Sequence, residues 1–333
     1  MFDSVPRCHL ATLPTPLEAG PELDGGVRLW VKRDDLTGLG GGGNKARKLE
    51  FLCADAFERG ARSLVTVGAA QSNHCRMTAA AGAVLGLEVH LVLAGDRPEV
   101  PAGNQLLSQL FGAHLHFTGI DDSRWGELEI YREQLIESLI ADGAAPYGIG
   151  IGGSSPIGAL GYVAGFMELM TDLERAGIEP AAIITTSSSG GTHAGLVAGR
   201  ALWQARGHAV PEVIAVGVAK GVNAGLPDIV ALAGEALALI GADTGLVTAD
   251  DVVVDPRWMG PDYGHPTPEG DAAIDLAARH HGWIMDRTYS GKGLSGVLGM
   301  IVEGRFAPGS DIVFIHTGGT PAVFAPGGAA VAP

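Results

Sequence analysis

Short runs of β-branched and aliphatic residues recur along the chain and alternate with stretches of helical periodicity. Such runs cover residues 63–67, 89–93, 182–185, 213–216 and 311–315. Each is apolar almost throughout, as is typical of strands in a parallel sheet that helices cover on both faces. Because no long linker interrupts the pattern, we expect an α/β protein with its sheets in one interwoven molecule rather than independent domains.

The first strong helical pattern begins at Lys45, directly after two glycines and an asparagine. Its apolar positions follow the spacing i, i+3, i+4, i+7 and i+8 and are expected to share one buried face: Leu49, Leu52, Cys53, Ala56 and Phe57. Glycines let a bulky partner approach, and the positive end of a helix disfavours protonation of a lysine. This setting suits a Schiff-base lysine, although a solvated helix start or a phosphate contact is a commoner role for such a residue.

Composition and charge restrict the partners of this lysine. The chain has 333 residues, is 46% hydrophobic and carries a formal net charge of −15. That charge argues against nucleic acid or an anionic membrane and favours a small-molecule partner. Cys8, Cys53 and Cys75 show neither a disulfide framework nor zinc-ligand spacing, so no metal site is indicated. We find no secretory or membrane-spanning segment and expect a cytoplasmic protein.

A turn rich in glycine and hydroxyl residues follows the first predicted strand, at residues 68–74. In open α/β sheets ligands bind outside the carboxyl ends of the strands, so this turn is a candidate site. Ser72 and Asn73 would stand at a helix N-terminus, where free N–H groups can hold a carboxylate and a serine hydroxyl can act as nucleophile or donor. Simple capping of the helix is the more ordinary role of such a pair.

Two further strand ends carry similar turns. Residues 185–192 combine several hydroxyls with two glycines, a cup suited to a phosphate dianion held largely by backbone N–H groups and without a lysine. Residues 316–321 would bring Thr317 against a bound ring, and a structural turn explains this segment equally well. A lysine, an anion cup and hydroxyl-lined strand ends together meet the needs of pyridoxal 5'-phosphate.

With these motifs in place, the chain resembles the 1-aminocyclopropane-1-carboxylate deaminase and D-cysteine desulfhydrase family of pyridoxal-phosphate enzymes. The motifs that carry the resemblance span nearly the whole chain and lie at residues 13–17, 31–37, 43–50, 71–74, 103–104, 158–162, 192–195, 289–292 and 316–319. The resemblance implies the fold type II architecture of tryptophan synthase β, with two open, twisted, mostly parallel sheets and helices on both faces. It also implies a homodimer.

The domain boundaries follow from the same resemblance. We expect a larger cofactor-binding domain from residues 1–50 and 159–333, and a smaller inserted domain from residues 51–158. The two are expected to close on an amino acid between them and to exclude water from the reacting centre.

The resemblance gives each matching residue an expected role toward the cofactor. Lys45 would hold it as a Schiff base and act as the base at the substrate Cα. Asn73 would approach its phenolic oxygen. The phosphate would be bound by Ser189, Gly190, Gly191 and Thr192.

Other matching residues would face the substrate. Ser72 would meet its carboxylate, with Asn73 and His74 beside it, and is expected to be catalytic. Tyr289, also expected to be catalytic, and Tyr263 match two family tyrosines that face the substrate. A tyrosine beside a glycine can also simply pack a turn.

Two positions divide the family by reaction. Deaminase-like members have a glutamate and a leucine where this chain has Ser290 and Thr317, which is the desulfhydrase-like pattern. Both residues are expected to meet the cofactor ring. Opening a cyclopropane requires a strong electron sink, whereas β-elimination requires only loss of a Cα proton and a good leaving group. The chain is therefore expected to convert D-cysteine to pyruvate, hydrogen sulfide and ammonia.

The sequence leaves the exact reaction open. L-cysteate sulfo-lyases share the family pattern, and the segment at residues 154–157 differs somewhat from relatives, so the β-substituent is undecided. Deamination of 1-aminocyclopropane-1-carboxylate also stays open, as does a silent pyridoxal-phosphate-binding protein. A dinucleotide-binding dehydrogenase is disfavoured because its Gly-x-Gly-x-x-Gly fingerprint is missing after the first strand.

Overall fold

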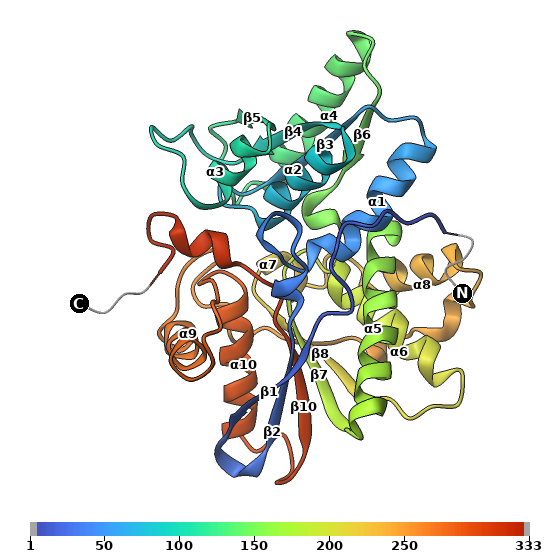
Figure 1. Cartoon of the computed structure of the whole chain (residues 1–333), viewed down its shortest axis with the longest axis vertical. Helices are drawn as coiled ribbons and strands as arrows, with labels where there is room; N and C mark the ends of the chain where they lie inside the picture. The colour runs from blue at the N-terminus through green and yellow to red at the C-terminus, as the bar shows by residue number, and fades with distance from the viewer. Residues whose placement is uncertain (1–4, 330–333) are drawn as a thin grey trace.

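The computed structural model describes residues 5–329 and contains a larger and a smaller β-sheet (Figure 1). The larger sheet has six strands among these residues, and only β1 runs antiparallel to its neighbour. In order across the sheet the strands are β1 (Leu17–Glu22), β2 (Arg28–Lys32), β10 (Asp311–Ile315), β7 (Pro180–Ser187), β8 (Glu212–Gly217) and β9 (Val253–Asp255).

The smaller sheet is parallel throughout. Its four described strands lie in the order β5 (His114–Phe117), β4 (Glu88–Leu93), β3 (Ser63–Gly68) and β6 (Pro146–Ile149). The five strands predicted from apolar runs are confirmed as β3, β4, β7, β8 and β10. The pattern did not reveal the other five: β1, β5 and β6 lack a run of three apolar residues, and the apolar residues of β2 and β9 stand between charged residues.

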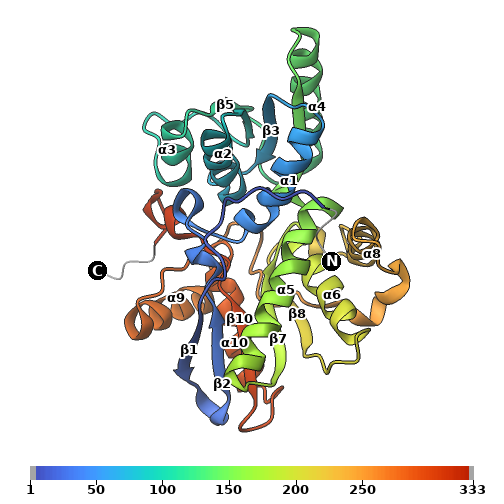
Figure 2. The ribbon, with the colours of Figure 1, turned by 45° about the vertical axis from the view of Figure 1, so that its right-hand side comes forward.

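Helices cover both faces of the larger sheet (Figure 2). One face packs against α5 (Pro156–Ala176) and α6 (Gly191–Gln204), and α8 (Ile229–Leu239) packs against these two helices. The other face packs against α9 (Pro268–His281) and α10 (Ser290–Val302). A single helical turn, α7 (Lys220–Asn223), follows β8. The predicted α/β class with sheets covered on both faces is therefore confirmed.

The smaller sheet is covered in the same way. On one face Leu64 and Leu91 contribute to a core shared with α2 (Asn73–Leu85), and α3 (Gly103–Leu110) packs against that helix. On the other face lies α4 (Trp125–Ala141). The strands of this sheet all come from residues 63–149, while those of the larger sheet flank that segment in sequence. Domain boundaries at residues 51 and 158 stay predictions. No helix among residues 5–329 is long and apolar enough to cross a membrane.

Helix α1 (Lys45–Glu58) lies where the two sheets meet (Figure 1). It begins at Lys45, as predicted, and its expected apolar face is buried at Leu49, Leu52, Cys53 and Ala56. The prediction was wrong for Phe57, whose side chain is 43% exposed. Periodicity assigned Phe57 to the buried face, but the last turn of α1 extends beyond the core.

A buried ion pair fixes α1 against the larger sheet. The Arg47 guanidinium donates through Nε and Nη2 to the Asp34 carboxylate, at 2.8 Å each, and through both Nη atoms to Glu168 at 2.9 Å. Thr15 and Tyr162 also donate to Asp34. Arg47 and Asp34 are 2% and 1% exposed. Burial alone would raise the pKa of Asp34, but Arg47 and the two hydroxyl donors hold it below its ordinary value.

Close backbone contact completes this anchor. A Cβ added to Gly161 on α5 would lie 2.4 Å from the carbonyl oxygen of Arg47. Only glycine therefore allows α5 to approach α1 at this point.

Removing the Arg47 cation should strongly destabilise the fold. We expect Arg47→Met to lower the free energy of unfolding by about 3–5 kcal/mol, because Asp34 would remain buried and unpaired. Denaturant titration at neutral pH measures this loss. The Asp34 carboxylate contributes fully to the free energy of unfolding above its unfolded-state pKa. This contribution falls as the pH drops through the depressed folded-state pKa. The difference in stability between the natural chain and Arg47→Met should therefore shrink in acid.

Arg59→Met is the matched control. Arg59 ends the same helix and pairs with Asp55 while 65% exposed, so its loss should cost less than about 1 kcal/mol. Equal losses in the two variants would contradict a special role for the Arg47 network.

Candidate active site

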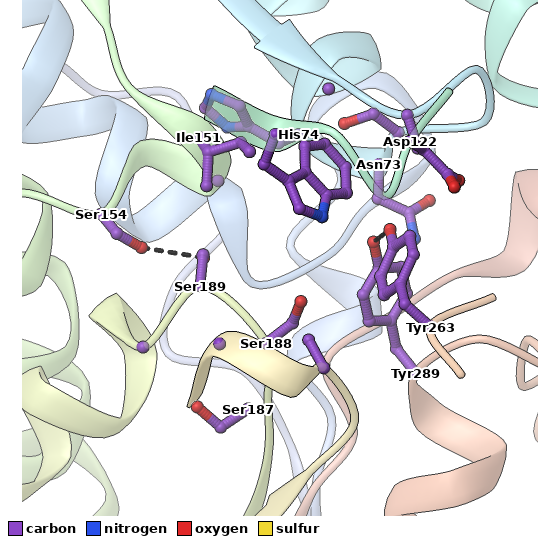
Figure 3. Close-up of a pocket in the computed structure, with 18 of the residues that line it drawn as sticks. Asn73, His74, Asp122, Ile151, Ser154, Ser187, Ser188, Ser189, Tyr263 and Tyr289 are labelled. Atoms are coloured by element: carbon purple, nitrogen blue, oxygen red, sulfur yellow. Dashed lines mark hydrogen bonds between the residues drawn. The ribbon is translucent and has the colours of Figure 1, made fainter. Parts of the chain in front are cut away.

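A cavity of about 710 Å³ lies between the two sheets (Figure 3). Its walls include the segments after β3, β7 and β8, at the carboxyl ends of parallel strands. Lys45, at the start of α1, also lines it. The structure therefore brings the first two predicted turns together with the predicted lysine, and Thr317 adds the third turn.

Lys45 enters the cavity from a glycine-rich turn. A Cβ on Gly42, which has φ +79°, would lie 1.8 Å from the Asp35 carbonyl oxygen, so this turn requires glycine. The Lys45 Nζ donates to Asn44 Oδ1 at 3.0 Å. Removal from water lowers the pKa of Lys45 to about 8; Asp286 opposes this shift and Arg76 adds to it. The amine is thus far more available as a nucleophile near neutral pH than an ordinary lysine.

The hydroxyl cup after β7 opens into the same cavity. Ser154 Oγ donates to Ser189 Oγ at 2.8 Å and accepts from Gly191 N at 3.0 Å (Figure 3). The hydroxyl of Ser187 is buried and has no hydrogen-bond partner within the described chain. Thr192 Oγ1 accepts from Asn44 at 3.0 Å, which links the cup to the residue before Lys45.

Lys48 lies beside this cup, which the sequence had suggested was free of lysine. Its Nζ donates to Gly152 O at 3.1 Å, and a Cβ on Gly191 would lie 2.8 Å from that Nζ. Burial, reinforced by the charge of Lys45, lowers the pKa of Lys48 well below its ordinary value. A dianion in the cup would favour the charged form of this buried lysine and oppose that shift. Spacing could have suggested Lys48, since it stands one helical turn after Lys45.

The predicted residues at the start of α2 also line the cavity. Ser72 Oγ accepts from Cys75 N at 3.1 Å, so this serine does cap the helix. Asn73 accepts from Asn104 at 3.0 Å through its side chain. His74 Nε2 lies 2.9 Å from Thr66 Oγ1, and burial keeps the pKa of His74 well below its ordinary value. His74 is therefore a neutral side chain in the wall.

The side chains of the two predicted tyrosines line the cavity and contact each other. The hydroxyls of Tyr263 and Tyr289 are in hydrogen-bond contact (Figure 3). Trp125, which belongs to none of the predicted motifs, packs edge-on against Tyr263 with ring centroids 5.6 Å apart. Removal from water raises the pKa of both tyrosines, so both hydroxyls stay protonated at neutral pH.

Asp286 is a wall residue that sequence reasoning missed. Its carboxylate accepts from the backbone N–H groups of Thr288 and Tyr289, and Asn73 Nδ2 lies 3.4 Å away. Burial raises the pKa of Asp286 to about 6, although these donors oppose the shift. The turn at residues 286–289 supplies two of these donors locally, but the place of Asp286 in the cavity wall beside Asn73 depends on the approach of this segment to α2.

Of the two positions that divide the family, Thr317 and Ser290, only one lines the cavity. Thr317 lines the cavity. Ser290 is fully buried outside the lining, and its hydroxyl accepts from Asp286 N at 2.9 Å. Contact of either residue with a cofactor ring stays a prediction.

The donor set fits pyridoxal phosphate. An amine of lowered pKa, an orphaned serine hydroxyl in a cup at the start of α6 and a buried lysine beside that cup match an aldehyde and a phosphate dianion. No group of three or more His, Cys, Asp or Glu side chains within residues 5–329 is placed to hold a metal ion.

This fold and this site define a pyridoxal-phosphate enzyme of fold type II. Residues 9–318 match the family model described as "Pyridoxal-phosphate dependent enzyme", and the chain belongs to that family. Among curated proteins it is 39% identical to the D-cysteine desulfhydrase of Klebsiella pneumoniae (strain 342) over 327 residues, 96% of each chain.

Solved structures agree with this assignment. A crystal structure of an ACC deaminase homologue aligns with a TM-score of 0.86 and 34% identity, covering 97% of this chain and 94% of that one. A fungal L-serine ammonia-lyase from Rhizomucor miehei shares the fold, with a TM-score of 0.66 and 20% identity over 95% of this chain and 96% of that one. The expected family, fold and cofactor are therefore confirmed.

Lys45→Ala should abolish covalent attachment of the cofactor. Borohydride reduction followed by mass spectrometry of the intact protein should add one reduced cofactor to the natural chain and none to the variant. Lys48→Met is the matched control: it keeps the Lys45 amine and should still be labelled, but only at a higher cofactor concentration. Labelling of Lys45→Ala at a single specific site would refute the assignment.

Proposed function

We propose that this chain is a lyase that removes the β-substituent of a small amino acid, with D-cysteine as its substrate. The overall reaction is D-cysteine plus water giving pyruvate, hydrogen sulfide and ammonia. The observation that carries this proposal is the convergence of Lys45, the hydroxyl cup and the start of α2 on one cavity, in a chain 39% identical to a D-cysteine desulfhydrase.

Each site residue has a proposed task. The cofactor, when bound, supplies the electron sink that makes the substrate Cα proton acidic. Lys45 accepts that proton, a task for which its lowered pKa suits it. The substrate carboxylate binds at the N-terminus of α2, where Ser72, Asn73 and His74 line the cavity. The phosphate binds Ser189, Gly190, Gly191 and Thr192, with Lys48 beside them.

The leaving group departs on the side of the tyrosines. Tyr289 and Tyr263 face the substrate and hold its β-substituent, since their paired hydroxyls line the cavity. The C–S bond breaks with loss of hydrosulfide, and the remaining aminoacrylate takes up water to give pyruvate and ammonia. Asn73, Ser290 and Thr317 are proposed to act on the cofactor, the first near its phenolic oxygen and the others near its ring.

Charge along the cavity favours a thiol over a sulfonate. Asp121, Asp122 and Asp262 line the cavity and lie at least partly in solvent. Lys220 also lines it, but this lysine already pairs with Asp262. A second negative charge on the substrate side chain would meet net repulsion there. We therefore place D-cysteine ahead of L-cysteate.

We expect the purified protein, loaded with pyridoxal phosphate, to form sulfide and pyruvate in equal amounts from D-cysteine. L-Cysteine, L-cysteate and 1-aminocyclopropane-1-carboxylate, offered separately, should react at least tenfold more slowly, about the discrimination expected from 1.4 kcal/mol in the transition state. Turnover of L-cysteate alone would identify a sulfo-lyase. 2-Oxobutanoate from the cyclopropane substrate alone would identify a deaminase, and no turnover of any amino acid would indicate a silent binding protein.

We also propose a homodimer in the cytoplasm, on the family resemblance and the cysteine pattern. Light scattering on the eluting peak of a size-exclusion column should give twice the 34.1 kDa chain mass. A monomer mass at micromolar concentration would contradict the dimer.

A further inference from the structure

The loop that carries Tyr263 has no strand or helix of its own. Residues 256–267 join β9 to α9 and form turns and irregular backbone. Within this loop, Tyr263 N donates to the Asp262 carboxylate and His265 N to the Asp262 carbonyl. Contacts with other parts of the chain must therefore set the position of the Tyr263 side chain over the cavity.

Lys292, on α10, supplies the first of these contacts. Its Nζ donates to Met259 O at 2.6 Å and lies 3.4 Å from Asp262 O, so it holds the backbone on both sides of the bend before Tyr263. The side chain is fully buried and pairs with no carboxylate in the described chain. Burial lowers the pKa of Lys292 to about 8, opposed by the charges of Asp286 and Asp262.

A buried ammonium without an ion-pair partner is costly, and an apolar side chain of the same length would cost less. Lys292 offsets this cost by donating hydrogen bonds to the loop carbonyls. This indicates that Lys292 serves to hold the loop rather than to pack the core.

The same face of α10 supplies a second contact. Gly296 and Gly299 follow Lys292 at i+4 and i+7, and the ring of Trp258 packs against both. A Cβ on Gly299 would lie 1.8 Å from Trp258 Cη2, so the tryptophan occupies the space left by the missing side chain. Lys292, Gly296 and Gly299 together form a single surface, here called the α10 face, on which the loop rests.

The helix that carries the α10 face influences the positions of both tyrosines. Tyr289 directly precedes α10, so its position is set by the start of this helix. Tyr263 is set by the loop that the same helix holds. Both hydroxyls of the pair are therefore supported by this helix, while Trp125 packs on the Tyr263 ring and Lys220 pairs with Asp262 in the same loop.

We propose that Lys292 is a positioning residue, which with Gly296 and Gly299 holds the 256–267 loop so that Tyr263 meets Tyr289 over the substrate. The proposal deepens the proposed function and rests on it for the role of Tyr263. It predicts that loss of Lys292 acts on catalysis through Tyr263.

A double-mutant cycle tests this coupling. With D-cysteine, Lys292→Met should lower kcat/KM by about tenfold or more in the natural chain but by less than about threefold in the Tyr263→Phe chain, because residues acting together are non-additive. A merely structural lysine would reduce both backgrounds by the same factor, and that result would overturn the proposal.

Limited trypsin digestion gives a readout without turnover. Arg257 is 53% exposed at the start of the loop, and cleavage after it, followed by the mass of the fragment beginning at Trp258, should accelerate severalfold in Lys292→Met. Unchanged cleavage would overturn the proposal. Faster cleavage in a protein that does not turn over D-cysteine would refute the proposed function and leave the positioning role supported.

Two further variants provide a second test of the loop contact and a control. Gly299→Ala should displace Trp258 and give the same faster cleavage and the same non-additivity with Tyr263→Phe, so it decides the matter if Lys292→Met does not fold. Arg279→Gln is the control, because Arg279 forms an exposed ion pair with Asp275 on α9 and should change neither measurement.

Discussion

The buried ion pair between Arg47 and Asp34 is the constraint on which the site depends. It holds α1 against the larger sheet through Asp34 and against α5 through Glu168. Lys45 begins the same helix, so the position of the reactive amine follows from a contact on another face of α1. A charge pair removed from water tolerates little displacement, because any gap leaves one charge uncompensated in a medium of low polarity. Rigidity of this kind is what a covalent cofactor site requires.

Burial and, after it, neighbouring charges lower the pKa of two lysines in the first turn of α1. Lys45 and Lys48 stand nearly one turn apart on α1, and burial lowers the pKa of both. The charge of Lys45 lowers the pKa of Lys48 further, and Arg76 does the same to Lys45. Asp286 opposes the shift of Lys45 but is itself partly neutralised by burial. A phosphate dianion in the cup would relieve this repulsion, so cofactor binding and the electrostatics of the cup are complementary.

The positions of the paired tyrosines Tyr263 and Tyr289 both depend on α10. Tyr289 belongs to the start of a helix, and Tyr263 to a loop that the same helix supports through Lys292 and two glycines. The same helix thereby contributes to the position of both hydroxyls, although 26 positions separate them in the chain. Placing loop residues on a rigid helix preserves the geometry of a site while leaving the loop sequence free to change specificity.

The sequence by itself determined the α/β class, the strands with continuous apolar runs, the helix that begins at Lys45 and the family with its cofactor. These depend on periodicity and on short motifs, which are local properties of a chain. Only the tertiary structure decided that Phe57 is exposed, that Lys48 lies beside the hydroxyl cup, and that Asp286 lines the cavity while Ser290 stays outside its lining. The physical reason is that burial and hydrogen bonding of a side chain depend on partners far away in sequence, and no local pattern records which distant segments will meet.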